Sequence, residues 1–356
     1  MPVLWTEHHR QHEPGEVWVG VRTAGTELPE RAERIRAALA DAGARLVEPS
    51  DHPREDMLTA HDASLVDHLA TAWDEWEAAG LTEDPGQDRV VPYLFPHPDL
   101  ISDRSPDPPH ELTARAGYFA YDTMSLIGPG SWDAIKAAAD CALSAAGLVL
   151  GGERAAYACC RPPGHHATRR SFGGSCYLNN SALAAARLRS SLGDPVAMVD
   201  LDAHHGNGAQ AIFYEDPGVL TGSVHVDPGA GWFPHFLGFA DETGAGAGEG
   251  ANRNHPLAPG SGDATWLAAV EDLASWARDG GARALVVPLG VDAAAGDTEA
   301  SLQVSAEGYR AAGRALGALG LPTVIVQEGG YDLDTIGELV RETLVGVEEG
   351  IAGGSV

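Results

Sequence analysis

The sequence predicts an α/β fold with a mostly parallel central sheet that carries helices on both faces. Apolar runs of strand length recur along the second half of the chain, and stretches with helical periodicity separate most of them. Short apolar strands that alternate with helices are typical of parallel sheets buried on both sides. The expected strands are 156–160, 196–201, 219–224, 284–289 and 323–326, and the expected helices are 181–192, 265–278, 306–319 and 336–347.

The first 80 residues continue this alternation of strands and helices. Residues 2–5 and 44–47 read as short strands, and the stretch 29–42 between them has an apolar helical face. The stretch 62–79 has apolar residues at spacings of three and four, which is the pattern of an amphipathic helix. These residues are Leu65, Leu69, Trp73 and Trp76. We expect both tryptophans to lie in the core.

A segment at about 82–109 interrupts the pattern. It is rich in Pro and Asp, has neither the helical nor the strand period, and is longer than an ordinary connection. We expect one domain over residues 1–356 with this segment as an inserted loop. Its apolar residues suggest that it contacts a second subunit in a homodimer, and the alternative is a loop folded over its own body. These residues are Val90, Val91, Tyr93, Leu94 and Phe95.

The charge balance argues against nucleic acid as a partner. The 356 residues include 51 acidic and 23 basic side chains, which gives a net charge of -28. Such a surface repels phosphate backbones and has few counterions to release on binding them. An acidic field instead concentrates cations near the protein, although the same acidity also serves solubility alone.

Cysteine use and hydropathy indicate a cytoplasmic protein that does not enter a membrane. The four cysteines form no CxxC pair and no spacing typical of a disulfide framework. The first residues lack the basic and apolar regions of a signal peptide. No apolar run reaches the roughly 18 residues that a membrane span needs.

Polar motifs follow four of the expected strands. They are RPPGHHA at 161–167, DLDAHHGNG at 200–208, GVD at 290–292 and QEGGY at 327–331. In parallel α/β sheets ligands bind beyond the carboxyl ends of the strands. One such motif is weak, because an acidic residue at a strand end is commonly a turn or cap residue. Four of them at successive strand ends indicate a functional site.

The second and third motifs have the composition of a metal site. Alternation along a strand would put Asp200, Asp202 and His204 on one face. Three polar side chains at the end of an apolar strand are costly to bury unless they meet a metal or one another. Aspartate and histidine suit a divalent ion such as zinc, and Asp292 would complete a three-ligand site with positions open for water and substrate.

These motifs resemble the signature segments of the histone deacetylase superfamily, which has an arginase-like α/β fold. Within it the chain is most similar to bacterial acetylpolyamine amidohydrolases and class II-like deacetylases. In the polyamine enzymes the long insert serves dimer assembly. The segments that carry the resemblance are 161–167, 172–180, 200–208, 233–244, 290–297 and 327–331.

The resemblance implies a zinc-dependent deacetylase that removes an acyl group, such as acetyl, from a polyamine or a lysine side chain. Asp202, His204 and Asp292 match the zinc ligands of the family. His166 matches the general base, and His165 matches its partner imidazole, which in the family is held by the aspartate at position 200.

Two further residues complete the implied machinery. Asn207 matches the residue that orients the general base, and it is an amide here, as in class II members. Tyr331 matches the hydroxyl that donates to the tetrahedral oxyanion. Some family members also bind a structural potassium ion, whose oxygens would come from Asp200, Asp202, His204, Ser223 and Val224.

The resemblance also implies a narrow substrate tunnel. Phe233 matches one aromatic wall, but Ser175 stands where the opposite aromatic is usual, which should widen the tunnel. Glu299 and Glu16 match positions at the entrance, where they would attract a cationic substrate or remain ordinary surface acids.

Three alternatives stay open at this point. The wider tunnel favours a deacylase acting on a bulkier or biosynthetic amide. A non-catalytic module that binds acylated amines would not need the intact His165, His166 and Tyr331. An arginase-like ureohydrolase would need additional Asp and His ligands for two manganese ions.

Overall fold

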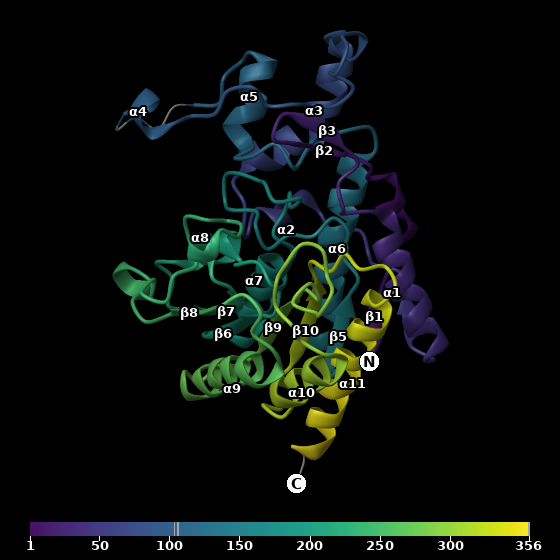
Figure 1. Cartoon of the computed structure of the whole chain (residues 1–356), viewed down its shortest axis with the longest axis vertical. Coiled ribbons are helices and arrows are strands. Elements are labelled where there is room, and N and C mark those ends of the chain that lie inside the picture. Colours follow the sequence, from purple (N-terminus) through teal and green to yellow (C-terminus); the bar gives the residue numbers. More distant parts are fainter. Residues whose placement is uncertain (103, 105–106, 355–356) are drawn as a thin grey trace.

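A computed structural model describes residues 1–102, 104 and 107–354, and its centre is one parallel sheet of eight strands (Figure 1). The order across the sheet is β4-β1-β5-β10-β9-β6-β7-β8, and every neighbouring pair is parallel. The strands are β1 (Pro2–Leu4), β4 (Arg45–Val47), β5 (Ala155–Ala158), β6 (Val196–Asp200), β7 (Val219–Val226), β8 (Asn252–Leu257), β9 (Leu285–Leu289) and β10 (Thr323–Gln327).

Helices cover both faces of this sheet. One face packs against α6 and α7, and the other packs against α1, α9, α10 and α11. The helices are α1 (Pro29–Asp41), α2 (Arg54–Met57), α3 (Ala63–Ala78), α4 (Pro98–Ile101), α5 (Leu112–Phe119), α6 (Ser131–Leu150), α7 (Asn180–Leu192), α8 (Asn207–Phe213), α9 (Asp263–Asp279), α10 (Ala306–Gly317) and α11 (Ile336–Gly353). Short 3₁₀ turns occur at Glu7–Gln11, Leu81–Glu83, Pro228–Ala230 and Gly246–Gly248.

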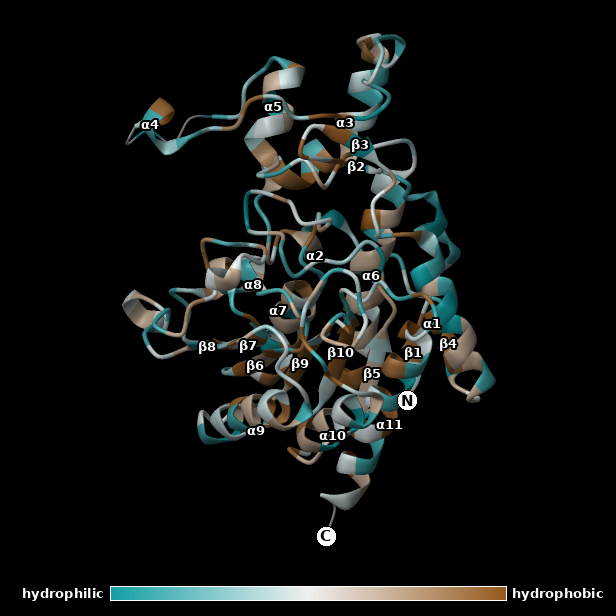
Figure 2. Ribbon diagram, viewed as in Figure 1, coloured by the Kyte–Doolittle hydropathy of each residue, from teal (hydrophilic) through white to brown (hydrophobic). Residues whose placement is uncertain are grey.

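The core consists of two apolar layers, one on each side of the sheet. Strand alternation divides neighbouring residues between them, so that Val324 and Val326 belong to one layer and Ile325 to the other. Figure 2 shows the apolar residues gathered on the central strands. The predicted fold class is therefore confirmed, and each predicted strand and helix has a counterpart, although α11 continues well past the predicted end at residue 347.

Several elements were not predicted from the sequence, and α6 and β8 are the two that belong to the helix and sheet layers of the core. Helix α6 is alanine-rich and buried over most of its circumference, so it lacks the one-sided apolar stripe that marks an amphipathic helix. Strand β8 reads NRNHPL and has no apolar run, because it is an edge strand whose Asn252 and Asn254 face a buried polar network.

The inserted segment forms an arm that extends away from the sheet and carries α4 at its far end (Figure 1). Val90 is buried and bridges to Ile127 of the body, so this residue is not available for a partner. Tyr93, Leu94 and Leu100 remain 68%, 45% and 65% exposed.

An antiparallel hairpin of β2 (Glu16–Trp18) and β3 (Val21–Thr23) stands apart from the main sheet. It carries Glu16 and Trp18 towards a cavity described below. Among the described residues, no helix is both long enough and apolar enough to cross a bilayer.

Helices α10 and α11 pack unusually closely because glycines line their contact. A Cβ added at Gly346 would lie 2.1 Å from the carbonyl oxygen of Arg310, and one at Gly313 would lie 2.2 Å from that of Thr343. Both distances are far inside van der Waals contact. Side chains larger than hydrogen would therefore force the two helices apart.

Gly346→Ala should lower the free energy of unfolding by about 1–3 kcal/mol, because overpacking a tight contact costs that much. Helix propensity alone would predict the opposite, a higher free energy of unfolding, because it favours Ala over Gly by roughly 1 kcal/mol. Gly353→Ala is the matched control in the same helix, since nothing lies within 4 Å of its added Cβ. Urea unfolding measures both variants, and equal stabilisation of both would contradict this account of the contact.

Candidate active site

The candidate site lies at the carboxyl ends of four adjacent strands, β5, β10, β9 and β6. The loop after each strand carries one of the sequence motifs, as parallel α/β architecture requires of a site at this edge. Strand β6 ends at Asp200, so the alternation expected over residues 200–204 is replaced by a bend.

Asp202, His204 and Asp292 form a compact three-residue group. One possible ligand atom from each lies within 4.8 Å of the other two. His204 Nδ1 lies 3.0 Å from Asp292 Oδ2 and 3.3 Å from Asp202 Oδ1. Asp202 and Asp292 are 1% and 0% exposed, so two carboxylates are buried side by side. Burial, followed by the negative charge of Asp202, raises the pKa of Asp292.

Backbone groups orient both carboxylates of this group. Gly329 N–H donates to Asp202 Oδ2 (2.7 Å), and Ala203 N–H donates to Asp292 Oδ1 (2.8 Å). A Cβ at Gly329 would lie 2.6 Å from an oxygen of each carboxylate, so glycine is required there. The donor set of two carboxylates and one imidazole fits a divalent cation such as zinc, which would offset the buried charge.

His165 and His166 lie side by side, with ring centroids 4.0 Å apart, but their environments differ. His165 Nδ1 lies 2.9 Å from Asp200 Oδ2. Burial alone would disfavour a charged ring, yet the carboxylates of Asp202 and Asp200 raise the pKa of His165 to about 10. Burial and the charge on His165 lower the pKa of His166. The geometry therefore favours one charged and one neutral imidazole.

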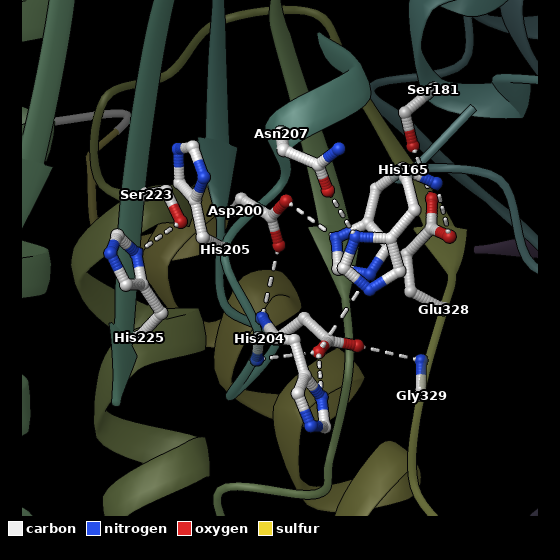
Figure 3. Close-up of polar contacts among 12 residues, drawn as sticks. His165, Ser181, Asp200, His204, His205, Asn207, Ser223, His225, Glu328 and Gly329 are labelled. Atoms are coloured by element: carbon white, nitrogen blue, oxygen red, sulfur yellow. Dashed lines mark hydrogen bonds and ion pairs between the residues drawn. The ribbon is translucent and has the colours of Figure 1, made fainter. Parts of the chain in front are cut away.

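Asn207 fixes the tautomer of His166. Its Oδ1 lies 2.6 Å from His166 Nδ1, and a carbonyl oxygen can only accept, so the proton must be on Nδ1. The unprotonated Nε2 is then the free nitrogen of a ring that lines the cavity. In Figure 3 the ring of His204 lies below Asn207 and His165.

Tyr331 reaches the site from the turn after β10. The guanidinium of Arg31 lies 4.7 Å from the centre of its ring. Arg31 also donates to the carbonyl oxygens of Gly330 and Glu328, so one buried side chain supports both the ring and the turn that carries it.

One cavity of about 310 Å³ joins these groups to solvent. His166, His204 and Tyr331 line it, together with all four residues expected from the tunnel, which are Phe233, Ser175, Glu299 and Glu16. Phe233 packs edge-on against His166 at 4.8 Å. Ser175 has φ +62° and donates its N–H to Ser125 Oγ (2.8 Å). The lining thus combines the aromatic ring of Phe233 with the smaller or more flexible side chains of Ser175 and Met124.

Two buried polar groups behind this site were not predicted from the sequence. Glu328 Oε2 accepts from the backbone N–H groups of Gly164 (2.6 Å) and His165 (3.0 Å), and its Oε1 accepts from Ser181 Oγ (2.8 Å), as Figure 3 shows in part. Glu328 therefore holds the backbone that carries the histidine pair. Its position directly before the GGY triplet, inside the motif at 327–331, is the sequence signal that could have identified it.

The second missed group centres on Gln210 of α8. Its Oε1 accepts from Asn252 and Asn254 (both 2.9 Å), and its Nε2 donates to Glu242 Oε2 (2.7 Å). Because Asn252 also donates to the carbonyl of Glu242, this network anchors the loop that carries Phe233. No local pattern identifies these partners, which lie far apart in the sequence.

Two of the residues expected to hold potassium, Asp202 and His204, belong to the cluster described above, and the other three lie on β6 and β7. Asp200 Oδ2 and Oδ1 contact His165 and the backbone N–H of Asp202, respectively. Ser223 and Val224 are buried in β7, and Ser223 Oγ lies 2.8 Å from His225 Nδ1 (Figure 3).

Comparison with known proteins decides the family. The histone deacetylase domain matches residues 26–347. The chain belongs to the histone deacetylase family. An acetylpolyamine amidohydrolase of Mycoplana ramosa is 39% identical over 98% of this chain and 99% of its own length. Acetylpolyamine amidohydrolase 1 of Pseudomonas aeruginosa is 39% identical over 97% and 98% of the two chains.

A solved structure shows that this chain also has the fold of the family. The crystal structure of an acetylpolyamine aminohydrolase from Burkholderia pseudomallei aligns with a TM-score of 0.90 at 36% identity, and the alignment covers 98% of this chain and 99% of that one. The histone deacetylase resemblance and the arginase-like fold expected from the motifs are both confirmed.

Proposed function

We propose that this protein is a zinc-dependent amidohydrolase that removes an acyl group from an acylated amine, with an acetylated polyamine or acetyl-lysine as substrate. The observation that carries the proposal is the convergence of three groups on one cavity. These are the Asp202–His204–Asp292 cluster, which reaches the cavity through His204, the ring of His166 and the side chain of Tyr331. The names of the amidohydrolase relatives support the same reaction class.

The chain's own residues then have distinct roles. A zinc ion held by Asp202, His204 and Asp292 would polarise the acyl carbonyl and lower the pKa of a bound water towards ~7. His166 accepts a proton from the attacking water at Nε2, because Asn207 keeps the other ring proton on Nδ1. Tyr331 donates a hydrogen bond to the carbonyl oxygen as it gains negative charge, an interaction typically worth ~3 kcal/mol in the transition state.

His165 has a different part from its neighbour. The contact of its Nδ1 with Asp200 Oδ2 (2.9 Å) favours the protonated ring, and a positive charge there favours the neutral form of His166. We assign His166 as the general base and His165 as a charged partner that stabilises the negative charge formed in the reaction.

A polyamine substrate is supported by the charge at the cavity entrance. Glu16 and Glu299 both line it, and a cationic tail that extends out of the tunnel would meet them. The net charge of -28 would add a general attraction for such a cation.

A bulkier or biosynthetic amide is the second candidate, because Ser175 leaves one wall without the aromatic that narrows the tunnel. Turnover of acetylated polyamines, acetyl-lysine peptides and longer acyl-lysines, measured side by side, distinguishes these substrates. A structural potassium ion beside β6 and a cytoplasmic location complete the proposal.

The purified protein should contain about one zinc ion per chain, because Asp202, His204 and Asp292 supply the three protein ligands of one catalytic site. Asp292→Ala should lose both the metal, measured by elemental analysis, and the deacylase activity. The control is Asp279→Ala, an exposed carboxylate 73% open to solvent. An Asp292→Ala protein with full metal content and full turnover would refute the ligand assignment.

Glu299→Gln should lower kcat/KM for acetylated polyamines a few-fold and leave a neutral acetyl-lysine peptide almost unchanged. The effect is small because partly exposed charge pairs are worth only ~0.2–1 kcal/mol. Added salt should mimic the substitution, since the Debye length falls from ~10 Å at 0.1 M to ~3 Å at 1 M. Equal losses on both substrates would mean that Glu299 does not read charge.

We further propose a homodimer in which the arm contacts the partner, because Tyr93 and Leu100 would otherwise expose apolar surface. Sedimentation should detect a dimer at micromolar concentration, and a variant with both Tyr93→Asp and Leu100→Asp should sediment as a monomer. Asp84→Ala, a change in a polar part of the insert, serves as the control. A strictly monomeric wild-type protein would contradict this assembly.

A further inference from the structure

The carboxylate of Asp297 lies in the loop after β9, five residues beyond the proposed ligand Asp292. Its side chain is only 9% exposed. Its Oδ2 accepts from the backbone N–H groups of Tyr331 (2.7 Å) and Asp332 (3.2 Å), and its Oδ1 accepts from that of Glu299 (3.0 Å). One carboxylate thus joins two loops that both line the substrate cavity.

A local turn explains only half of this arrangement. The bond from Glu299 N–H spans two residues and is the ordinary side-chain turn that Asp forms in loops. The bonds from Tyr331 and Asp332 span 34 and 35 residues and join different strands of the sheet. A residue needed only for its own turn would not require these contacts.

The turn that carries Tyr331 needs such a support. It follows two glycines, and Gly330 has φ +118°, a conformation open to glycine but costly for other residues. Glycine leaves the backbone free to take other conformations. Arg31 holds this turn through the carbonyls of Glu328 and Gly330, and Asp297 holds it through the N–H groups of the next two residues.

We infer that Asp297 is a positioning residue that sets the place of the Tyr331 hydroxyl and, through its other oxygen, the place of Glu299. The inference rests on the proposed function, which gives Tyr331 its role in the reaction. Asp297 itself is not proposed to touch the substrate. It couples the group that stabilises the transition state to the acid that faces the substrate's tail.

A double-mutant cycle with Tyr331 tests the first part. Asp297→Ala should lower kcat for N-acetylputrescine about 10- to 100-fold with a smaller change in KM, because a misplacement of about 1 Å can cost about 100-fold. In a Tyr331→Phe background the same change should cost almost nothing more, since the hydroxyl is already gone. Equal losses in both backgrounds would mean that Asp297 acts on the fold alone and would overturn the inference.

The conservative variant separates the two oxygens. In Asp297→Asn the amide oxygen can still accept from Tyr331 and Asp332, but the amide nitrogen cannot accept from Glu299. Asp297→Asn should therefore recover most of kcat and still lose the preference for cationic substrates. Asp334→Ala, an exposed acid in the same turn, is the control and should match the wild type in both readouts.

A crystal structure of Asp297→Ala keeps this inference separate from the proposed function. Failure of the wild-type protein to hydrolyse any acylated amine would reject the proposed function. The structural inference would still stand if Tyr331 and Glu299 were displaced in the variant. Unchanged positions of both residues would overturn it, whatever the activity.

Discussion

The whole site depends on burying two carboxylates beside each other at the end of a hydrophobic sheet. Asp202 and Asp292 are almost inaccessible to solvent, and an isolated buried charge is costly unless it is compensated. One oxygen of each carboxylate accepts a hydrogen bond from a backbone N–H, and His204 lies between the two side chains. The charged ring of His165 is part of the same balance. Removing His204 or His165 would leave the two carboxylates without part of this compensation.

This constraint explains why the fold and the centre of the candidate site could be predicted from the sequence. Buried parallel strands must be apolar, so β6, β9 and β10 stand out, and the polar residues that end them contrast with those runs. Asp202, His204, Asp292 and the histidine pair were visible for that reason. Assigning Asn207, Tyr331, Phe233 and Ser175 required the family resemblance, because no local pattern distinguishes them from ordinary loop residues.

The residues that hold the site residues in place could not be predicted from the sequence. Glu328, Gln210 and Asp297 act through partners that are tens to hundreds of positions away, and sequence spacing carries no trace of such contacts. Helix α6 and strand β8 were missed for a related reason. Helix α6 contacts neighbours on most of its surface, and β8 is a polar strand. Periodicity detects only elements that have one apolar face.

The order of strands in the sheet also bears on how the chain acquires its structure. Strand β10 is the last strand in the sequence, yet it lies between β5 and β9 near the middle of the sheet. Until it is in place, β4-β1-β5 and β9-β6-β7-β8 have no strand pairing between them. During synthesis the two halves can therefore join only after β10 has been made. Pairings between such distant segments form slowly and leave strand edges exposed in the meantime. Chaperone demand and sensitivity to C-terminal truncation follow from this order.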